Sequence, residues 1–143
     1  MHSAVVLLVQ AENKEDAVFE AENFMDQEVG HAFDYYSIED NNWGDLIGSK
    51  EKEEFVLPLS ECKDKVIEYS KSKDLEIEYF QSLADQYKKA GDNQMYGFAL
   101  KHLGEIIGEY FTPYAGVYNI DMSDYSIPDN TDDWWAVVAD MHH

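Results

Sequence analysis

DWWAVVADMHH, residues 133–143, is the stretch that defines the fold most clearly, and it reads as a β-strand rich in apolar residues. Successive side chains of an extended chain point to opposite faces, so Trp134 and Trp135 must face opposite ways. The two rings therefore cannot form one platform for stacking a nucleic-acid base, which would also require positive surroundings. We expect one tryptophan in the core and the other on the outer face or at a rim.

A second apolar run, AVVLLV at residues 4–9, is short and continuous, as is typical of a strand buried on both faces. Asn13 then has the character of a helix N-cap. Apolar residues follow it at helical spacing as far as Gly30, which is suited to end a helix. HAFDYYSI, residues 31–38, is predicted as a second strand. These elements predict a β-α-β unit whose helix crosses between two strands.

The middle of the chain is predicted to be helical, starting with Ser60 as N-cap and ending at Thr112 and Pro113. The polar segment SKSKD, residues 70–74, is a weak point in this helical region. Gly91 ends it, and Asp92 is the expected cap of the next helix. The residues expected to continue the inner apolar face beyond the weak point are Leu75, Tyr79, Phe80, Leu83 and Tyr87.

A short strand at 55–57 and two longer strands at 115–122 and 133–141 complete the prediction. The expected fold is a single α+β domain over residues 1–143. Its order is β-α-β, then a helical insert of two to three helices at 60–111, then β-β. A ferredoxin-like sheet is the nearest named arrangement.

The chain is strongly acidic, with 30 acidic and 10 basic residues and a net charge of −20, and every basic residue is lysine. Arginine, the side chain best suited to grip phosphate, is missing from the sequence. This charge disfavours direct binding to nucleic acid or to an anionic membrane surface. A protein with a basic surface, or a divalent cation, is the partner that it would attract.

The charge is unevenly distributed along the chain. Residues 1–59 carry a net charge of −11 and residues 111–143 carry −6, whereas residues 60–110 carry only −3. If the two ends of the chain pair in space, their charges merge into one acidic region and the middle segment stands apart as nearly neutral.

Few residues suggest catalysis. The sequence has no Gly-rich phosphate loop, no strand–Ser–helix elbow and no familiar zinc-binding spacing. Cys62 is the single cysteine, which fits a reducing cytosol and is typical of a small packing residue. The first ten residues lack the basic region of a signal peptide. We therefore predict a cytoplasmic protein that is not an enzyme and has no cofactor.

A metal or small-molecule site at the end of the last strand is the alternative. Asp140 and His142 lie on one side of an extended strand, and imidazole with carboxylate suits zinc, manganese or iron. Such a site would need a third ligand from His2 or His31, brought in by sheet pairing. His102, on an otherwise apolar helix stripe, is expected to be a partly buried, hydrogen-bonded histidine and not a ligand.

Trp43 is the most distinctive residue of the polar loop that follows the second strand. Exposed aromatic residues on loops can anchor a protein interface. The alternative is that the ring folds back over the edge of the sheet, and this is the reading that we favour.

The segment AVVLLVQAENKEDAVFEAENFMD, followed by DYYSI and NNWGDLIG and by the terminal DWWAVVADMHH, resembles small uncharacterised proteins of tailed bacteriophages. Those proteins have a DYY-x-I-G-G-R-W-x-G segment and a hydrophobic final strand ending in Asp-x-His. The matching residues here are Asp34, Tyr35, Tyr36, Ile38, Trp43, Gly44, Trp134, Trp135, Asp140 and His142. This chain departs from the pattern where EDNN replaces the Gly-Gly-Arg. The resemblance covers the two ends of the chain and implies a phage origin but no activity.

These features together predict a phage-encoded protein that binds and inhibits a host protein with a basic surface, as a monomer or a dimer. A nucleic-acid-binding defence enzyme is the expected class of target, because ordered carboxylates can imitate phosphates in a basic cleft. In a variant without mimicry, Trp43 and the helical insert bind the host protein. The residues predicted to contact the partner are Glu12, Glu15, Asp16, Glu20, Glu22 and Asp26 on the first helix, with Glu39, Asp40, Trp43 and Asp45 in the loop.

Overall fold

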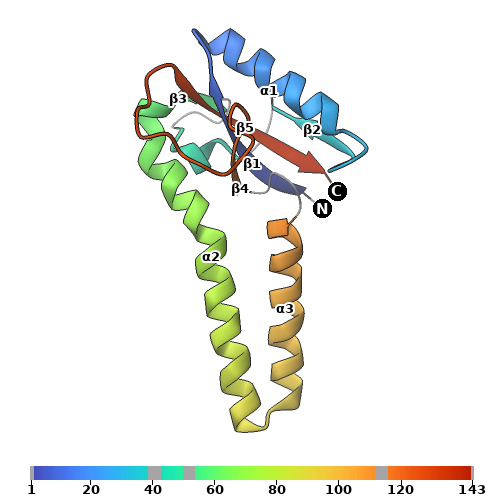
Figure 1. The fold of residues 1–143 in the computed structure, drawn as a ribbon. Helices are drawn as coiled ribbons and strands as arrows, with labels where there is room; N and C mark the ends of the chain where they lie inside the picture. Colours follow the sequence, from blue (N-terminus) through green and yellow to red (C-terminus); the bar gives the residue numbers. More distant parts are fainter. Residues whose placement is uncertain (1, 39–42, 50–53, 112–115, 143) are drawn as a thin grey trace.

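The computed structural model describes residues 2–38, 43–49, 54–111 and 116–142. It contains five strands, three α-helices and one short 3-10 helix within these residues (Figure 1). In chain order they are β1 (His2–Gln10), α1 (Lys14–Glu28), β2 (Tyr35–Ser37), η1 (Gly44–Ile47), β3 (Val56–Pro58), α2 (Leu59–Ala90), α3 (Asn93–Phe111), β4 (Gly116–Asn119) and β5 (Trp134–His142).

The strands form one sheet in which β1 and β5 are central, in the order β2-β5-β1-β4. β1 and β5 are antiparallel and pair along their whole length, from His2 opposite His142 to Gln10 opposite Trp134. β4 adds to β1 in parallel. The other side of β5 is shared, because β3 pairs with its first half and β2 with its end. The two ends of the chain therefore meet at the centre of the sheet.

The α+β class is confirmed, but the ferredoxin-like arrangement holds only in part. β1 and β2 are linked by α1 with another strand between them, as in a ferredoxin-like unit. That strand is β5, the last of the chain. The edge strand β4 runs parallel to β1, whereas a ferredoxin-like sheet is antiparallel throughout. A connection through two long helices gives the chain the length that a parallel crossover needs.

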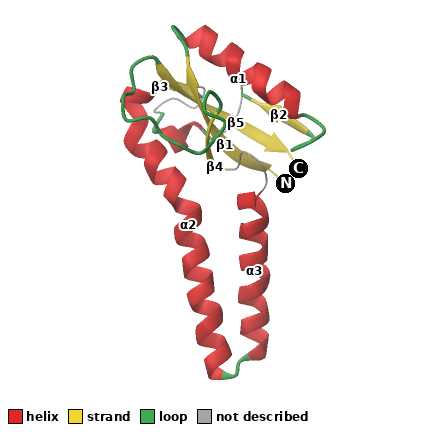
Figure 2. Ribbon diagram, in the orientation of Figure 1, coloured by secondary structure: helices red, strands yellow, loops and turns green. Residues whose placement is uncertain are grey.

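Helices cover both faces of the sheet (Figure 2). On one face, α1 packs Ala17, Ala21 and Met25 against the sheet, and all three are fully buried. On the other face, η1 and the first turns of α2 form a second core through Ile47, Leu59, Cys62 and Val66. Trp135 packs on the side of the sheet that α1 covers, and Trp134 packs on the side that α2 covers, so the predicted opposition of the two rings is confirmed.

The helix ends show which capping predictions were right. Asn13 caps α1, with its Oδ1 accepting from the Asp16 amide at 2.9 Å, and Asp92 caps α3 by accepting from the Met95 amide. Gly91 follows α2 with a φ of 74°, in the left-handed conformation that glycine adopts without strain. Ser60 is not a cap, because α2 already begins at Leu59 after Pro58, whose fixed φ suits a helix start.

The weak point predicted at residues 70–74 does not interrupt the helix, because α2 continues to Ala90, so the insert consists of two helices. Ser70 and Ser72 donate their hydroxyl groups to backbone carbonyls three residues earlier, Ile67 and Tyr69, so both polar groups are satisfied inside the helix. Beyond the sheet, α2 and α3 form a hairpin that projects from the sheet (Figure 1). Leu75 and Tyr79, expected on an inner face, are exposed there.

No described helix is both long enough and apolar enough to cross a membrane.

Candidate functional site

The pairing of β1 with β5 brings the two acidic ends of the sequence together. The head, which we define as the sheet with α1 and η1, is built from residues 1–59 and 111–143. These segments carry 20 acidic residues and 3 lysines, a net charge of −17. Since the whole chain carries −20, residues 60–110, which hold most of α2 and α3, contribute only −3. The head is therefore the part of the molecule that attracts a basic partner at a distance.

The outer face of α1 presents acidic side chains in two rows. The buried residues Ala17, Ala21 and Met25 define the side of α1 that faces the sheet. At 3.6 residues per turn, Glu15, Glu22 and Asp26 fall in one row on the outer side, and Asp16 and Glu20 fall in a second row. All of these except the half-buried Glu22 are exposed. Lys14 is the single basic residue of the helix.

Phe19 lies between the two acidic rows and is 59% exposed. It is one helical turn from Glu15, Asp16 and Glu22, so the ring is surrounded by carboxylates. An apolar ring left in water on a helix whose other side is fully packed has no role in the core. This face can therefore offer a partner both charge and an apolar contact. We call it the α1 face, comprising Glu15, Asp16, Phe19, Glu20, Glu22 and Asp26.

The other acidic residues predicted at the partner site lie elsewhere. Glu12 is exposed directly before α1 and extends the α1 face. Asp45 is exposed on η1, which covers the opposite face of the sheet, so the structure does not bring it to the α1 acids. Glu39 and Asp40 lie outside the described residues. The chain thus passes from β2 in the sheet to η1 on the face opposite to α1, and the local sequence does not indicate on which face η1 lies.

Asp26 also has a structural role within the α1 face. The Tyr36 hydroxyl donates to Asp26 Oδ1 at 2.5 Å and reaches the Glu22 carbonyl at 3.3 Å. Burial, followed by the hydrogen bond to Asp26, raises the pKa of Tyr36 above its usual value, so the phenol stays protonated and remains a donor. One of the two oxygens of Asp26 is thus occupied within the molecule.

Trp43 folds back on the sheet, which is the alternative that we favoured from the sequence, and it is not an exposed anchor. Its ring is half-buried against the core beneath α2. Its indole Nε1 donates to Asp140 Oδ1 at 3.1 Å, which ties the loop before η1 to the end of β5. The expected contribution of Trp43 to a partner interface is therefore reduced.

Asp140 and Trp43 belong to a polar and aromatic group at the end of the sheet where β1 begins and β5 ends. We call this group the terminal cluster, and its members are His2, Asp34, Tyr35, Trp43, Asp140 and His142. It joins two of the sequence segments that carry the phage resemblance. Trp43 and Asp140, one from each of these segments, are 97 positions apart.

Two histidine–aspartate pairs lie side by side in the terminal cluster. His2 Nδ1 is 3.0 Å from Asp140 Oδ2, and His142 Nδ1 is 3.6 Å from Asp34 Oδ2, which is too long for a hydrogen bond. The two imidazole rings meet edge to face at 4.9 Å, and Tyr35 stacks on His142 at 4.4 Å. Sheet pairing thus brings His2 beside Asp140 and His142, which is the placement that the metal alternative required of His2 or His31.

This arrangement does not form a metal site among the described residues, which contain no group of three His, Cys, Asp or Glu side chains placed to hold an ion. His31, the other proposed third ligand, is exposed in the turn after α1. Asp140 is already committed to two donors, Trp43 and His2. The terminal cluster instead connects β1, β5 and Trp43, the residue before η1, through the contacts that Asp140 makes with His2 and Trp43.

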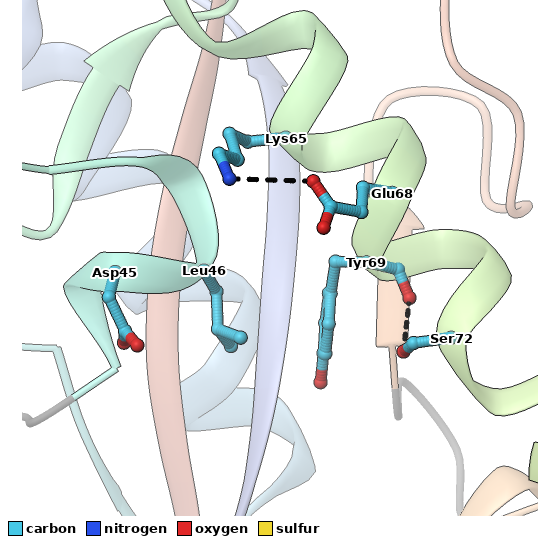
Figure 3. A pocket seen from close by; sticks show the side chains of 6 residues that line it. All are labelled: Asp45, Leu46, Lys65, Glu68, Tyr69 and Ser72. Carbon is cyan, nitrogen blue, oxygen red and sulfur yellow. Dashed lines mark hydrogen bonds and ion pairs between the residues drawn. The ribbon is translucent and has the colours of Figure 1, made fainter.

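A pocket of about 270 Å³ lies between η1 and α2 (Figure 3). Its lining residues are Asp45, Leu46, Lys65, Glu68, Tyr69 and Ser72. Lys65 is paired with Glu68 at 3.5 Å, and the Tyr69 hydroxyl donates to the Ala4 carbonyl on the sheet. Both groups are thus engaged within the protein, and the volume falls below the usual range of ligand pockets, about 300–1,000 Å³.

Cys62 is the buried packing residue that was expected, whereas His102 is partly buried but its Nδ1 lies 3.6 Å from Glu105 Oε2, too far for the expected hydrogen bond. Cys62 is buried in the core under α2, and burial raises the pKa of its thiol to about 12, with a further contribution from Glu61. A thiol with that pKa is not a nucleophile at neutral pH. His102 lies between the rings of Phe80 and Phe98 on the hairpin.

No family model, curated protein or solved structure matches the chain, so function is inferred from its own residues. Sequence reasoning missed Phe19 as a site residue. The signal was present, because Phe19 is two positions out of phase with the buried stripe of Ala17, Ala21 and Met25, which places it on the opposite side of the helix.

Proposed function

We propose that this protein is a non-enzymatic acidic interaction protein that binds a basic protein surface through the α1 face and blocks it. The exposed α1 face, with Phe19 between two rows of carboxylates, is the observation that carries the proposal. A partner that normally holds nucleic acid fits best, because its cleft must be basic to bind phosphate. Following the phage resemblance, this partner is a defence enzyme in the cytoplasm of the host.

The spacing of the carboxylates on α1 supports mimicry of a phosphate backbone. The α1 face carries five acidic residues between Glu15 and Asp26. At 1.5 Å per residue they extend over about 17 Å, so one carboxylate occurs per about 4 Å of helix axis. A single DNA strand carries one phosphate per about 3.4 Å of helix axis. A cleft that follows a nucleic-acid strand therefore meets a similar linear charge density on α1.

Phe19 adds a contact that phosphate mimicry alone does not need. Aromatic rings that become buried at an interface contribute much of its binding energy, whereas rim charges act mainly on the rate of association. The proposed complex therefore has two components, namely long-range attraction by the carboxylates and a short-range apolar contact by Phe19. Salt weakens the first component and leaves the second largely unchanged.

The experiment is capture of partners from host lysate at about 50 and 500 mM salt, because the higher concentration screens exposed charges. The identified partner is then titrated with three variants. The first replaces Glu15, Glu20 and Glu22 by Gln, the second is Phe19→Ser, and the third is a control that replaces Glu76, Glu78 and Asp85 on the hairpin by their amides. The test variant and the control remove the same number of exposed or half-buried charges.

We expect the α1 charge variant to lose affinity at low salt and Phe19→Ser to lose at least about tenfold at both salts, equivalent to about 1.4 kcal/mol. The hairpin control should bind like the wild type. Equal losses in the α1 and hairpin charge variants would mean that only net charge matters, which rejects the α1 face as the site. Unchanged binding by all three variants would reject the proposal outright.

A further inference from the structure

Only the first turns of α2 contact the sheet, and most of the hairpin lies away from it. α2 contacts the core beneath the sheet through Leu59, Cys62, Val66 and Tyr69, and beyond Tyr69 it runs beside α3 (Figure 1). We call residues 70–106 the distal hairpin. At 1.5 Å per residue, residues 70–90 of α2 extend over about 30 Å. This length of two-helix structure is not covered by the sheet.

The distal hairpin buries few of its side chains. Among its described side chains only Ala84, Ala99 and Ile106 are buried, and the two alanines bury little apolar area. Helices of this length in proteins are stabilised mainly by packing an apolar face against other elements. Two helices side by side can cover only one face of each other. The distal hairpin therefore keeps apolar surface that a further layer of helices would cover.

That exposed surface is aromatic and crosses both helices. Tyr79 meets Phe80 edge to face at 5.2 Å, Phe80 stacks on His102 at 5.3 Å, and Phe98 meets His102 at 4.4 Å. Tyr79 is 61% exposed and Phe98 is 50% exposed. We call these four residues the aromatic stripe. Leu75, one turn before Tyr79, is also exposed and lies beside its end.

The charge of the distal hairpin identifies what can cover the stripe. It carries six acidic residues and five lysines, a net charge of −1, whereas the rest of the chain carries −19. A basic partner gains little there and is drawn to the head. A second copy of the chain is repelled from the head but meets no net repulsion at the distal hairpin. Within the described part of the chain, the stripe is thus an apolar surface that a like-charged molecule can approach.

We propose that the aromatic stripe is the dimer interface of this protein, at which two distal hairpins pack side by side in opposite directions into a four-helix arrangement. A two-fold axis places the same residues on both sides, so Tyr79 and Phe98 of one copy face the stripe of the other. The two heads then lie at opposite ends of about 30 Å of paired helix, well beyond the screening length of about 8 Å at physiological salt. The α1 faces stay free for the partner.

The test is the mass in solution by sedimentation equilibrium, with the full chain at up to about 200 µM, where an interface of micromolar affinity is populated. We expect a mass of twice 16.5 kDa. Because salt screens repulsion between the heads, the dimer should be at least as stable at about 500 mM as at 50 mM salt. Binding of a basic partner responds to salt in the opposite direction.

Two variants probe the interface and one serves as the control. The double variant Tyr79→Ser with Phe98→Ser removes both exposed rings. Leu75→Glu puts a charge beside the stripe at an exposed site, so folding is unaffected. We expect either variant to weaken the dimer at least about tenfold. Phe19→Ser, which removes an equally exposed ring from the head, should leave the dimer unchanged.

A monomeric mass at every concentration in both salts overturns the dimer and leaves the stripe to a different partner. A dimer that Leu75→Glu does not weaken, in variants with wild-type helical circular dichroism, means that another surface pairs. Neither result affects the proposed partner site, since that proposal depends on Phe19 and the α1 charges.

Discussion

Replacing Asp140 with alanine should destabilise the protein more than its position near a strand end suggests. Its carboxylate accepts from the Trp43 indole at 3.1 Å and lies 3.0 Å from His2 Nδ1. The Asp140 side chain is only 20% exposed, whereas that of His2 is 51% exposed. The substitution leaves the indole N–H of a half-buried ring without its acceptor.

The magnitude follows from the two contacts. A hydrogen bond to a charged acceptor contributes about 1.5–3 kcal/mol, and leaving its buried partner unpaired has a similar cost. The pair with His2 adds about 0–1 kcal/mol because half of the imidazole is in water. Asp140→Ala should therefore lower the free energy of unfolding by about 2 kcal/mol. At about 2–4 °C per kcal/mol for a domain of this size, the Tm falls by about 4–8 °C.

Urea unfolding followed by tryptophan fluorescence and by far-ultraviolet circular dichroism measures this change. Asp140→Asn keeps one carbonyl oxygen for the indole and should cost only about half as much. Asp129→Ala, at an exposed loop acid, is the control and should stay within about 0.5 kcal/mol of the wild type. If the Ala and Asn variants have the same free energy of unfolding, the indole hydrogen bond does not stabilise the protein. The connecting role that we assign to the terminal cluster is then refuted.

Three further outcomes are expected. Because burial raises the pKa of Cys62 from 9.0 to about 12, a thiol reagent at pH 8 should label the native protein far more slowly than the urea-unfolded protein. The unfolded thiol ionises first, so the free energy of unfolding should also fall as pH rises from 9.0 to about 12, and fast native labelling would contradict the burial. Met25→Ala, at a fully buried site, should cost about 2–5 kcal/mol in urea unfolding, whereas the exposed Met122→Ala should cost less than about 0.5 kcal/mol; equal losses would contradict the core assignment. Zinc, manganese or nickel at about 10 µM should shift the Tm by less than about 1 °C, and a larger shift that Asp140→Ala abolishes would restore the metal alternative.

The two central strands and most helix ends could be predicted from local sequence. The apolar runs at 4–9 and 134–139 form the two central strands, and their residues are largely buried on both faces of the sheet. Asn13 and Asp92 act through hydrogen bonds to amides three residues away, so their caps depend on nothing distant. Such features are encoded within a few residues and can therefore be recognised without a structure.

The features that were wrong or missed depend on distant parts of the chain. Periodicity places Leu75 and Tyr79 on one side of α2 but does not show whether another element covers that side. Strand order depends on which apolar edges meet, and β5 lies between β1 and β2 only because the chain returns to the sheet after α3. Asp45 was grouped with the α1 acids because both are acidic and close in sequence, yet the loop carries it across the sheet.

The central position of β5 determines how this protein can fold as it is synthesised. Among the described strands, β1 leaves the ribosome before the others and its antiparallel partner β5 leaves after them. The hairpin depends on contacts between neighbouring helices and can form early, whereas a sheet closed by contacts of such high contact order forms slowly. Until residues 134–142 are released, the apolar residues of β1 lack their main neighbour and are open to chaperones or to other nascent chains. Only then can β5 pair with β1, β2 and β3 and complete the sheet.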